Sequence, residues 1–182
     1  MSDWDSTWGQ EFSCSVCGNK QIVLPSGPED SHILIIESHP DEDDIKQQRP
    51  LAGPRGSVLS NELRRNGFNL SAIRICSMWR HDPPSKKDTN YEQCFMEGIE
   101  LCIKEAKNKD IVLLLGSEAV KFFCDASVSD TSGLKITSNY LSNPVIMSSI
   151  QPTIVFKQGG VGEFRLSIKK FCDEMEKLEN DR

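Results

Sequence analysis

The chain has 182 residues and a formal net charge of −6, from 21 basic and 27 acidic side chains. This length suits one α/β domain that buries most of its apolar surface, and the acidic balance argues against binding nucleic acid through overall charge alone. No apolar run reaches the about 20 residues that cross a membrane, and the acidic first residues do not resemble a secretory signal. We therefore expect a cytoplasmic protein with reduced cysteines, some of them holding metal.

The first half of the chain predicts two strands and one helix. Residues 32–36 form a short continuous apolar run, which is typical of a strand buried on both faces. A polar loop is expected from there to Gly56, with its acidic residues on a solvated face. Residues 57–66 carry apolar side chains at helical spacing and stop at Gly67, a suitable residue after a helix end. A second strand is expected over residues 72–76.

The second half continues the same alternation. A helix is expected from about residue 91 to 107, where Cys94 and several other apolar side chains share one face. The remaining elements expected are a strand over 110–115, a helix over 118–124 with Ser117 as its N-cap, a strand over 144–149 and a helix over 163–178.

Strands that alternate with helices predict a parallel sheet covered on both faces. We expect one domain over residues 1–182, a three-layer α/β/α sandwich around a four-stranded parallel sheet. Ligands of such sheets gather at the carboxyl ends of the strands. Those ends carry Glu37, residues 77–81, residues 116–117 and Gln151.

Cysteine spacing predicts a metal centre near the start of the chain. Cys14 and Cys17 form a CxxC pair, and His81 and Cys94 stand far downstream. Three thiolates and one imidazole make an ordinary closed zinc site, whereas iron–sulfur clusters usually take four thiolates. Either metal is expected to be structural and to clasp residues 1–30 onto a later loop.

The order of these motifs resembles the uracil-DNA glycosylase superfamily, most closely its iron–sulfur-containing thermophile-type branch. The matching motifs, in chain order, are Glu37 in place of Gly-Glu-Ala-Pro-Gly, Arg49-Pro-Leu-Ala-Gly-Pro-Arg-Gly56 in place of Pro-Phe-x-Gly-x-x-Gly, Arg80-His-Asp-Pro-Pro84 in place of Lys-Cys-Arg-Pro-Pro, Cys94 as the last cluster ligand, Leu114-Leu-Gly-Ser117 with Ala119 as Leu-Gly-x-x-Ala, and Gln151-Pro152 in place of His-Pro. The resemblance favours a [4Fe–4S] cluster and the ligand set favours zinc, so the metal stays open between the two.

The resemblance implies a DNA-binding protein of replication or repair, which takes a flipped nucleotide into a pocket. Glu37 would orient the attacking water, and Gln151 would stand where the leaving base is stabilised. Trp79 is expected either to stack on a base or to anchor its loop. The residues expected to hold DNA phosphates are Arg49, Gly53, Arg55, Gly56, Gly116, Ser117 and Lys157.

Three positions of the base pocket depart from the pattern of that family. Leu51 replaces its base-stacking Phe, Ser77 its base-reading Asn and Gln151 its anion-stabilising His. Because one lost transition-state donor costs about 3 kcal/mol, we expect weak or no uracil excision and an accessory role beside a DNA polymerase or another replication protein. Two alternatives stay open: an active glycosylase that uses Glu37 on uracil or another deaminated base, and a protein-interaction module that does not bind DNA.

Overall fold

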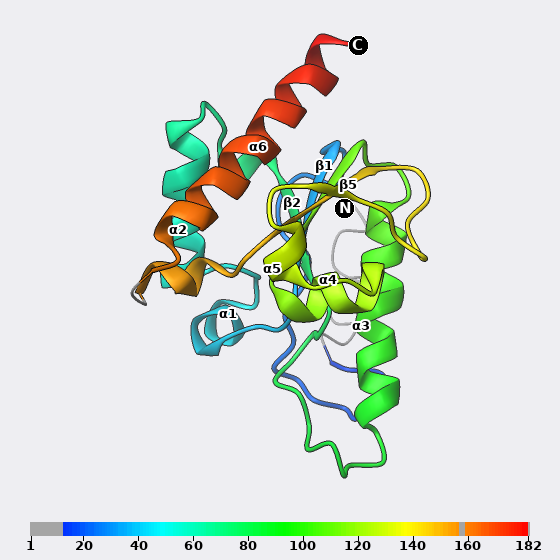
Figure 1. Ribbon diagram of the computed structural model, residues 1–182. Helices are drawn as coiled ribbons and strands as arrows, with labels where there is room; N and C mark the ends of the chain where they lie inside the picture. The colour runs from blue at the N-terminus through cyan, green and yellow to red at the C-terminus, as the bar shows by residue number, and fades with distance from the viewer. Residues whose placement is uncertain (1–12, 157–158, 182) are drawn as a thin grey trace, which may run out of the picture.

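The computed structural model describes residues 13–156 and 159–181, and it has the three-layer α/β/α architecture predicted from the sequence (Figure 1). A five-stranded sheet in the order β2-β1-β3-β5-β4 forms the middle layer, and only β4 runs antiparallel to its neighbour. The strands are β1 (Ile33–Glu37), β2 (Arg74–Ser77), β3 (Ile111–Leu115), β4 (Lys135–Ile136) and β5 (Val145–Ser149).

Helices cover both faces of the sheet. They are α1 (Glu42–Gln47), α2 (Pro54–Arg65), α3 (Tyr91–Ala106), α4 (Ser117–Cys124), α5 (Val128–Thr131) and α6 (Val161–Asn180), with short 3₁₀ turns at Leu70–Ala72 and Pro152–Phe156. Helices α2 and α6 pack on one face around Ile35, and α3 and α4 pack on the other face around Leu34 and Ile36. Since successive strand residues point to opposite faces, burial on both faces explains the unbroken apolar run of β1.

The structure corrects four details of the predicted fold. The sheet has five strands and is mixed, because the two-residue β4 pairs with the edge of β5. The expected polar loop contains α1, which begins at a capping box formed by Asp41 and Asp44. The expected loop after α4 contains α5. The N-cap of α4 is Gly116, at φ 98°, and Ser117 is the first helical residue.

Strand register brings the predicted ligand-binding edge together. Glu37 at the end of β1 stands beside Ser77 of β2 and Leu115 of β3. Leu115 in turn stands beside Ser149 of β5, two residues before Gln151.

Among the described residues, no helix is both long enough and apolar enough to cross a bilayer.

Candidate functional site

Glu37 is a wholly buried carboxyl at the carboxyl end of the interior strand β1. Its side chain has no exposed surface, and the Ser77 hydroxyl donates a hydrogen bond of 2.7 Å to its Oε1. Its Oε2 lies 3.4 Å from Nη2 of Arg55 and accepts no hydrogen bond among the described residues. Burial raises the pKa of Glu37 to about 8, and the nearby charge of Asp44 adds to that rise while Arg55 opposes it. The carboxyl is therefore mostly protonated at neutral pH.

Arg55 binds three carboxylates at once. Its Nε donates to Asp41 at 2.8 Å and its Nη2 to Asp44 at 2.5 Å, while the same Nη2 faces Glu37. Asp44 is itself fully buried and accepts the backbone N–H of Ala52 at 2.7 Å. Asp44 and Asp41 thus belong to a network around Arg55, which corrects the expected solvated face for these two residues, whereas Glu42 is exposed as expected and Asp43 is half-buried. The guanidinium of Arg55 is directed to carboxylates rather than left free for a phosphate.

The three positions expected to form a base pocket are engaged inside the protein. Leu51 is 4% exposed and packs in the core beneath α2. The hydroxyl of Ser77 is taken up by Glu37. The amide Nε2 of Gln151 donates to the carbonyl of Leu115 at 3.0 Å, and its buried Oε1 has no hydrogen-bond partner among the described residues. Gln151 folds so closely over Gly116 that a Cβ there would stand 2.3 Å from Nε2.

A cleft of about 660 Å³ opens next to this group. It is lined by Ser38, His39, Asp41, Glu42, Asp43, Pro54, Arg55, Ser117, Glu118, Gln151, Thr153 and Phe156. Arg55 contacts Glu37 and also lines the cleft, whereas Glu37 does not belong to the lining among the described residues. Four carboxylates stand in this lining, so its mouth is acidic. His39 Nδ1 lies 3.5 Å from Glu118 Oε2 across the cleft.

The residues expected to hold phosphates are distributed unevenly around the cleft. Ser117 lines it, beside Gly116 at the amino end of α4. Gly53 caps α2, but the Asp43 carboxylate would stand 2.6 Å from a Cβ on Gly53, so an acidic group already covers that helix end. Two others lie apart from the lining: Arg49 is exposed and donates to Gln47, and Gly56 abuts the Leu51 carbonyl. Lys157 lies outside the described residues.

The four predicted metal ligands come together, which confirms their grouping. The ligand atoms of Cys14, Cys17, His81 and Cys94 all lie within 4.8 Å of one another. Cys14 Sγ is 3.7 Å from Cys94 Sγ, and Cys17 Sγ is 3.6 Å from His81 Nε2. His81 Nδ1 lies 2.8 Å from the carbonyl oxygen of Asp82, an arrangement that leaves Nε2 free to bind a metal.

Two of these separations, 3.7 and 3.6 Å, match those around one tetrahedral ion, whereas the whole set of ligand atoms spans up to 4.8 Å. Zinc–sulfur bonds of about 2.3 Å and zinc–nitrogen bonds of about 2.0–2.1 Å place the ligand atoms of a tetrahedron about 3.6–3.8 Å apart. A [4Fe–4S] cluster attaches each ligand to a different iron and so holds its ligands farther apart. Trp79 and Ile22 pack against the site, and Glu97 accepts a hydrogen bond from the Cys14 thiol at 3.0 Å. Cys14, His81 and Cys94 are buried, whereas Cys17 is exposed.

Ionisation of Glu37 is expected to make the folded protein less stable as the pH rises. Its folded pKa of about 8 lies above the ordinary value of 4.5, so between these values the folded state holds a proton that the unfolded chain has released. Stability is then expected to fall by roughly 3–5 kcal/mol across that window. Glu37→Gln, which cannot ionise, is expected to lose this dependence in urea unfolding measured from pH 5 to pH 8. Glu100→Gln, at an exposed carboxylate of α3, serves as the control and should keep the wild-type slope. Parallel slopes in wild type and Glu37→Gln would refute the expectation.

Comparison with known proteins agrees with this architecture. The family described as the Uracil DNA glycosylase superfamily matches residues 24–170, a range that includes the whole sheet and Glu37. The chain is 26% identical to the type-4 uracil-DNA glycosylase of Thermotoga maritima over 152 residues, which cover 79% of this chain and 78% of that protein. The resemblance inferred from the motif order is confirmed, and the chain belongs to the uracil-DNA glycosylase superfamily.

Proposed function

We propose that this chain is a DNA-binding protein of replication or repair that excises uracil weakly or not at all. In this role it acts as an accessory subunit beside a DNA polymerase or another replication protein, in the reducing cytoplasm that its thiol ligands require. One observation carries the proposal: Glu37 is fully buried, paired with Arg55 and mostly protonated at neutral pH. A protonated carboxyl can neither activate water as a base nor stabilise a positively charged sugar.

The contacts of the base-pocket positions support the same proposal. Reading the edge of uracil requires free hydrogen-bonding groups. The hydroxyl of Ser77 donates its hydrogen bond to Glu37, and the side-chain amide of Gln151 donates an N–H to the Leu115 carbonyl. Leu51 lies in the core rather than in the cleft lining. A base entering the cleft would therefore find neither a free Ser77 hydroxyl nor an apolar side chain at position 51 on which to rest.

An active glycosylase is the second candidate, and one observation favours it. The carboxyl at the end of β1 is retained, and the related Thermotoga maritima protein is named a uracil-DNA glycosylase. In this alternative Glu37 works on uracil or on another deaminated base.

Excision and binding assays separate the candidates. Oligonucleotides that contain uracil or hypoxanthine, single-stranded and duplex, are incubated with wild type and Glu37→Gln, with the Thermotoga maritima enzyme as the positive control. We expect equal, near-background excision by both variants, together with DNA binding that weakens as salt rises. Turnover that Glu37→Gln abolishes would establish the active glycosylase. Absence of DNA binding at low salt would instead favour a protein-interaction module, in keeping with the acidic mouth of the cleft.

We further propose zinc as the ion held by Cys14, Cys17, His81 and Cys94. The Cys₃His ligand set and the ligand separations support a single tetrahedral ion over a cluster. Bound there, zinc would supply a cross-link between the amino-terminal segment and the loop after β2. The site contributes no group to the Glu37 cleft, so its role is structural.

A further inference from the structure

A second hollow lies beside the cleft and is lined mainly by aromatic side chains. Ser117 and Glu118 at the start of α4 line both the cleft and this hollow, whose volume is about 460 Å³. This volume falls within the about 300–1,000 Å³ that is typical of pockets for small organic groups. We call it the aromatic hollow and define it by Trp79, Tyr91, Phe95 and Phe122.

Three separate elements supply these rings and fix them against one another. Trp79 follows β2, and its ring centroid lies 5.0 Å from that of Tyr91 and 5.0 Å from that of Phe95, both on α3. Phe122 of α4 meets Phe95 edge to face at 5.3 Å. Helix α3 comes this close because residue 98 is glycine, and a Cβ there would stand 1.8 Å from the Met78 carbonyl oxygen.

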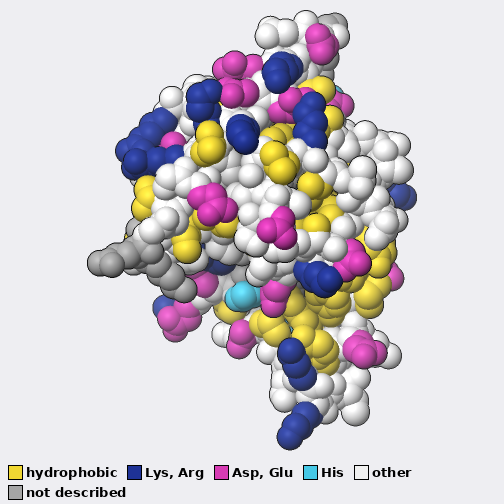
Figure 2. All heavy atoms as spheres, viewed as in Figure 1, with side chains coloured by type: hydrophobic (Ala, Val, Ile, Leu, Met, Phe, Trp, Pro, Cys, Tyr) yellow, Lys and Arg dark blue, Asp and Glu magenta, His cyan; other side chains and the backbone are white. Residues whose placement is uncertain are grey.

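Part of this aromatic surface is open to solvent. Trp79 is 4% exposed and forms a buried wall of the hollow, whereas Tyr91, Phe95 and Phe122 are partly exposed. Tyr140 stacks on the outer side of Phe122 at 4.9 Å and extends the surface. Figure 2 shows hydrophobic side chains gathered on the lower part of this face of the molecule.

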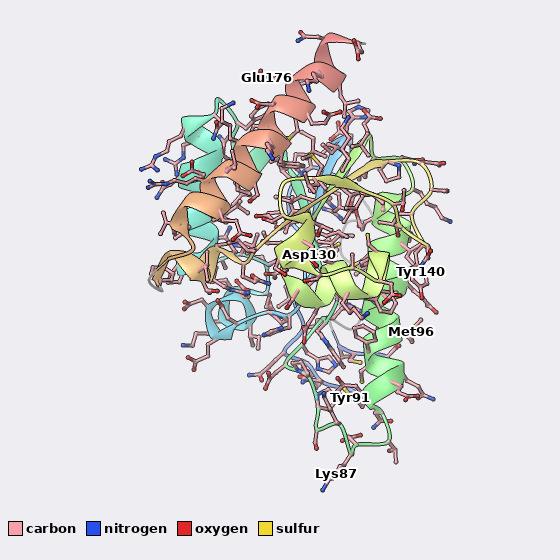
Figure 3. The ribbon with its side chains drawn as sticks, in the orientation of Figure 1. Lys87, Tyr91, Met96, Asp130, Tyr140 and Glu176 are labelled. Atoms are coloured by element: carbon pink, nitrogen blue, oxygen red, sulfur yellow. The ribbon has the colours of Figure 1, made fainter. Side chains whose placement is uncertain are left out.

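One lysine lines the aromatic hollow, and two more are exposed on the loop that leads to it. Lys86 and Lys87 are exposed on the loop before α3, and Lys87 lies at the tip of the loop that leads to Tyr91 (Figure 3). Lys121 lines the hollow and pairs with the exposed Asp125. Glu118 is the one carboxylate among the described lining residues, and His39 faces it. Aromatic rings edged by lysines are the combination with which proteins hold the bases and phosphates of single strands.

We propose that the aromatic hollow binds an unpaired nucleobase of the DNA strand that passes through the adjoining cleft. This inference rests on the DNA binding proposed above. The base stacks on the exposed aromatic surface beside Phe122 and Tyr91, and the lysines neutralise the phosphates on either side of it. The protein accordingly prefers single-stranded DNA, or duplex with unpaired nucleotides next to the bound site, over fully paired DNA.

Substitutions that remove the ring but keep apolar bulk test the proposal. Phe122→Leu and Tyr91→Leu are compared with wild type by fluorescence anisotropy, using a labelled single-stranded oligonucleotide and its duplex. Each substitution is expected to weaken single-strand binding about tenfold, as loss of one base stack does, and to leave duplex binding within about twofold. Phe68→Leu, a partly buried ring in the α2–α6 layer away from the hollow, is the matched control and should change neither affinity.

An abasic scan tests the same idea without altering the protein. Single abasic nucleotides are placed in turn along the single strand, and one position is expected to weaken wild-type binding about tenfold while having no effect on Phe122→Leu. Unchanged single-strand affinity in both hollow variants, or an abasic scan without a sensitive position, overturns the inference and leaves the hollow to a protein partner. Failure of the wild type to bind either DNA would overturn the proposed function as well, so the two failures are distinguishable.

Discussion

Purified protein is expected to contain one zinc ion per chain, and Cys94→Ser is expected to lose that ion and melt about 8–16 °C lower. The physical reason is that the ion cross-links residues that lie far apart in the sequence, so its loss frees the amino-terminal segment from the loop after β2. Over the described residues 13–32, Cys14 and Cys17 belong to a segment without helix or strand, and their partners His81 and Cys94 follow β2 and begin α3. Without the ion, the residues around Cys14 and Cys17 keep a small apolar cluster with Ile22 and Trp79 and hydrogen bonds to Glu97, and the segment is otherwise held by backbone hydrogen bonds from Val23 onward. Elemental analysis and thermal melting measure the two effects.

Cys172→Ser is the matched control for this experiment. Cys172 is a buried thiol of α6 at 1% exposure, outside the metal centre. It should lose some core packing and keep its zinc. Iron with sulfide and a visible absorbance band would contradict zinc while keeping the ligand set, and a wild type free of both metals would overturn the metal centre.

Arg55→Met is expected to cost about 3–5 kcal/mol of stability at pH 8, because it leaves buried carboxylates without their counter-charge. Glu37 and Asp44 have no exposed surface, and both lie against the Arg55 guanidinium. As the pH falls, protonation of Glu37 removes part of the uncompensated charge, so the cost should shrink by pH 5. Urea unfolding at both pH values measures the difference.

Arg49→Met provides the control, since Arg49 lies in the same loop but is exposed and bonds only to Gln47 among the described residues. Its effect is expected to stay within about 0.5 kcal/mol at either pH. An Arg55→Met cost that is equal at pH 5 and pH 8 would mean that packing of the side chain, rather than its charge, matters at this position.

The sequence predicted those elements whose residues carry their own pattern. Strands β1 and β3 were predictable because burial on both faces requires unbroken apolar runs. Helix α1 was missed because Ile45 is its only aliphatic residue, although the Asp41–Asp44 capping box was a readable signal. The two residues of β4 carry no pattern, because pairing with β5 alone makes them a strand.

The position of the candidate site could be predicted from the sequence, but the contacts made by its side chains could not. The place of Glu37 followed from the end of β1, and the grouping of the metal ligands followed from cysteine spacing. The pairing of Arg55 with three carboxylates depends on how α1 folds back against α2, which no local pattern specifies. The aromatic hollow likewise combines a loop, α3 and α4, so Trp79 alone gave only an ambiguous signal.

The position of β1 between β2 and β3 in the sheet constrains how the chain assembles on the ribosome. This strand is synthesised first, yet its two neighbours end only at residues 77 and 115. Until both have emerged, the nascent chain carries an apolar strand with open edges, which is a target for aggregation or for chaperone capture. The metal centre likewise cannot be completed until Cys94 has been synthesised, long after Cys14 and Cys17. Translation arrest before residue 115 would therefore release an aggregation-prone fragment rather than a folded subdomain.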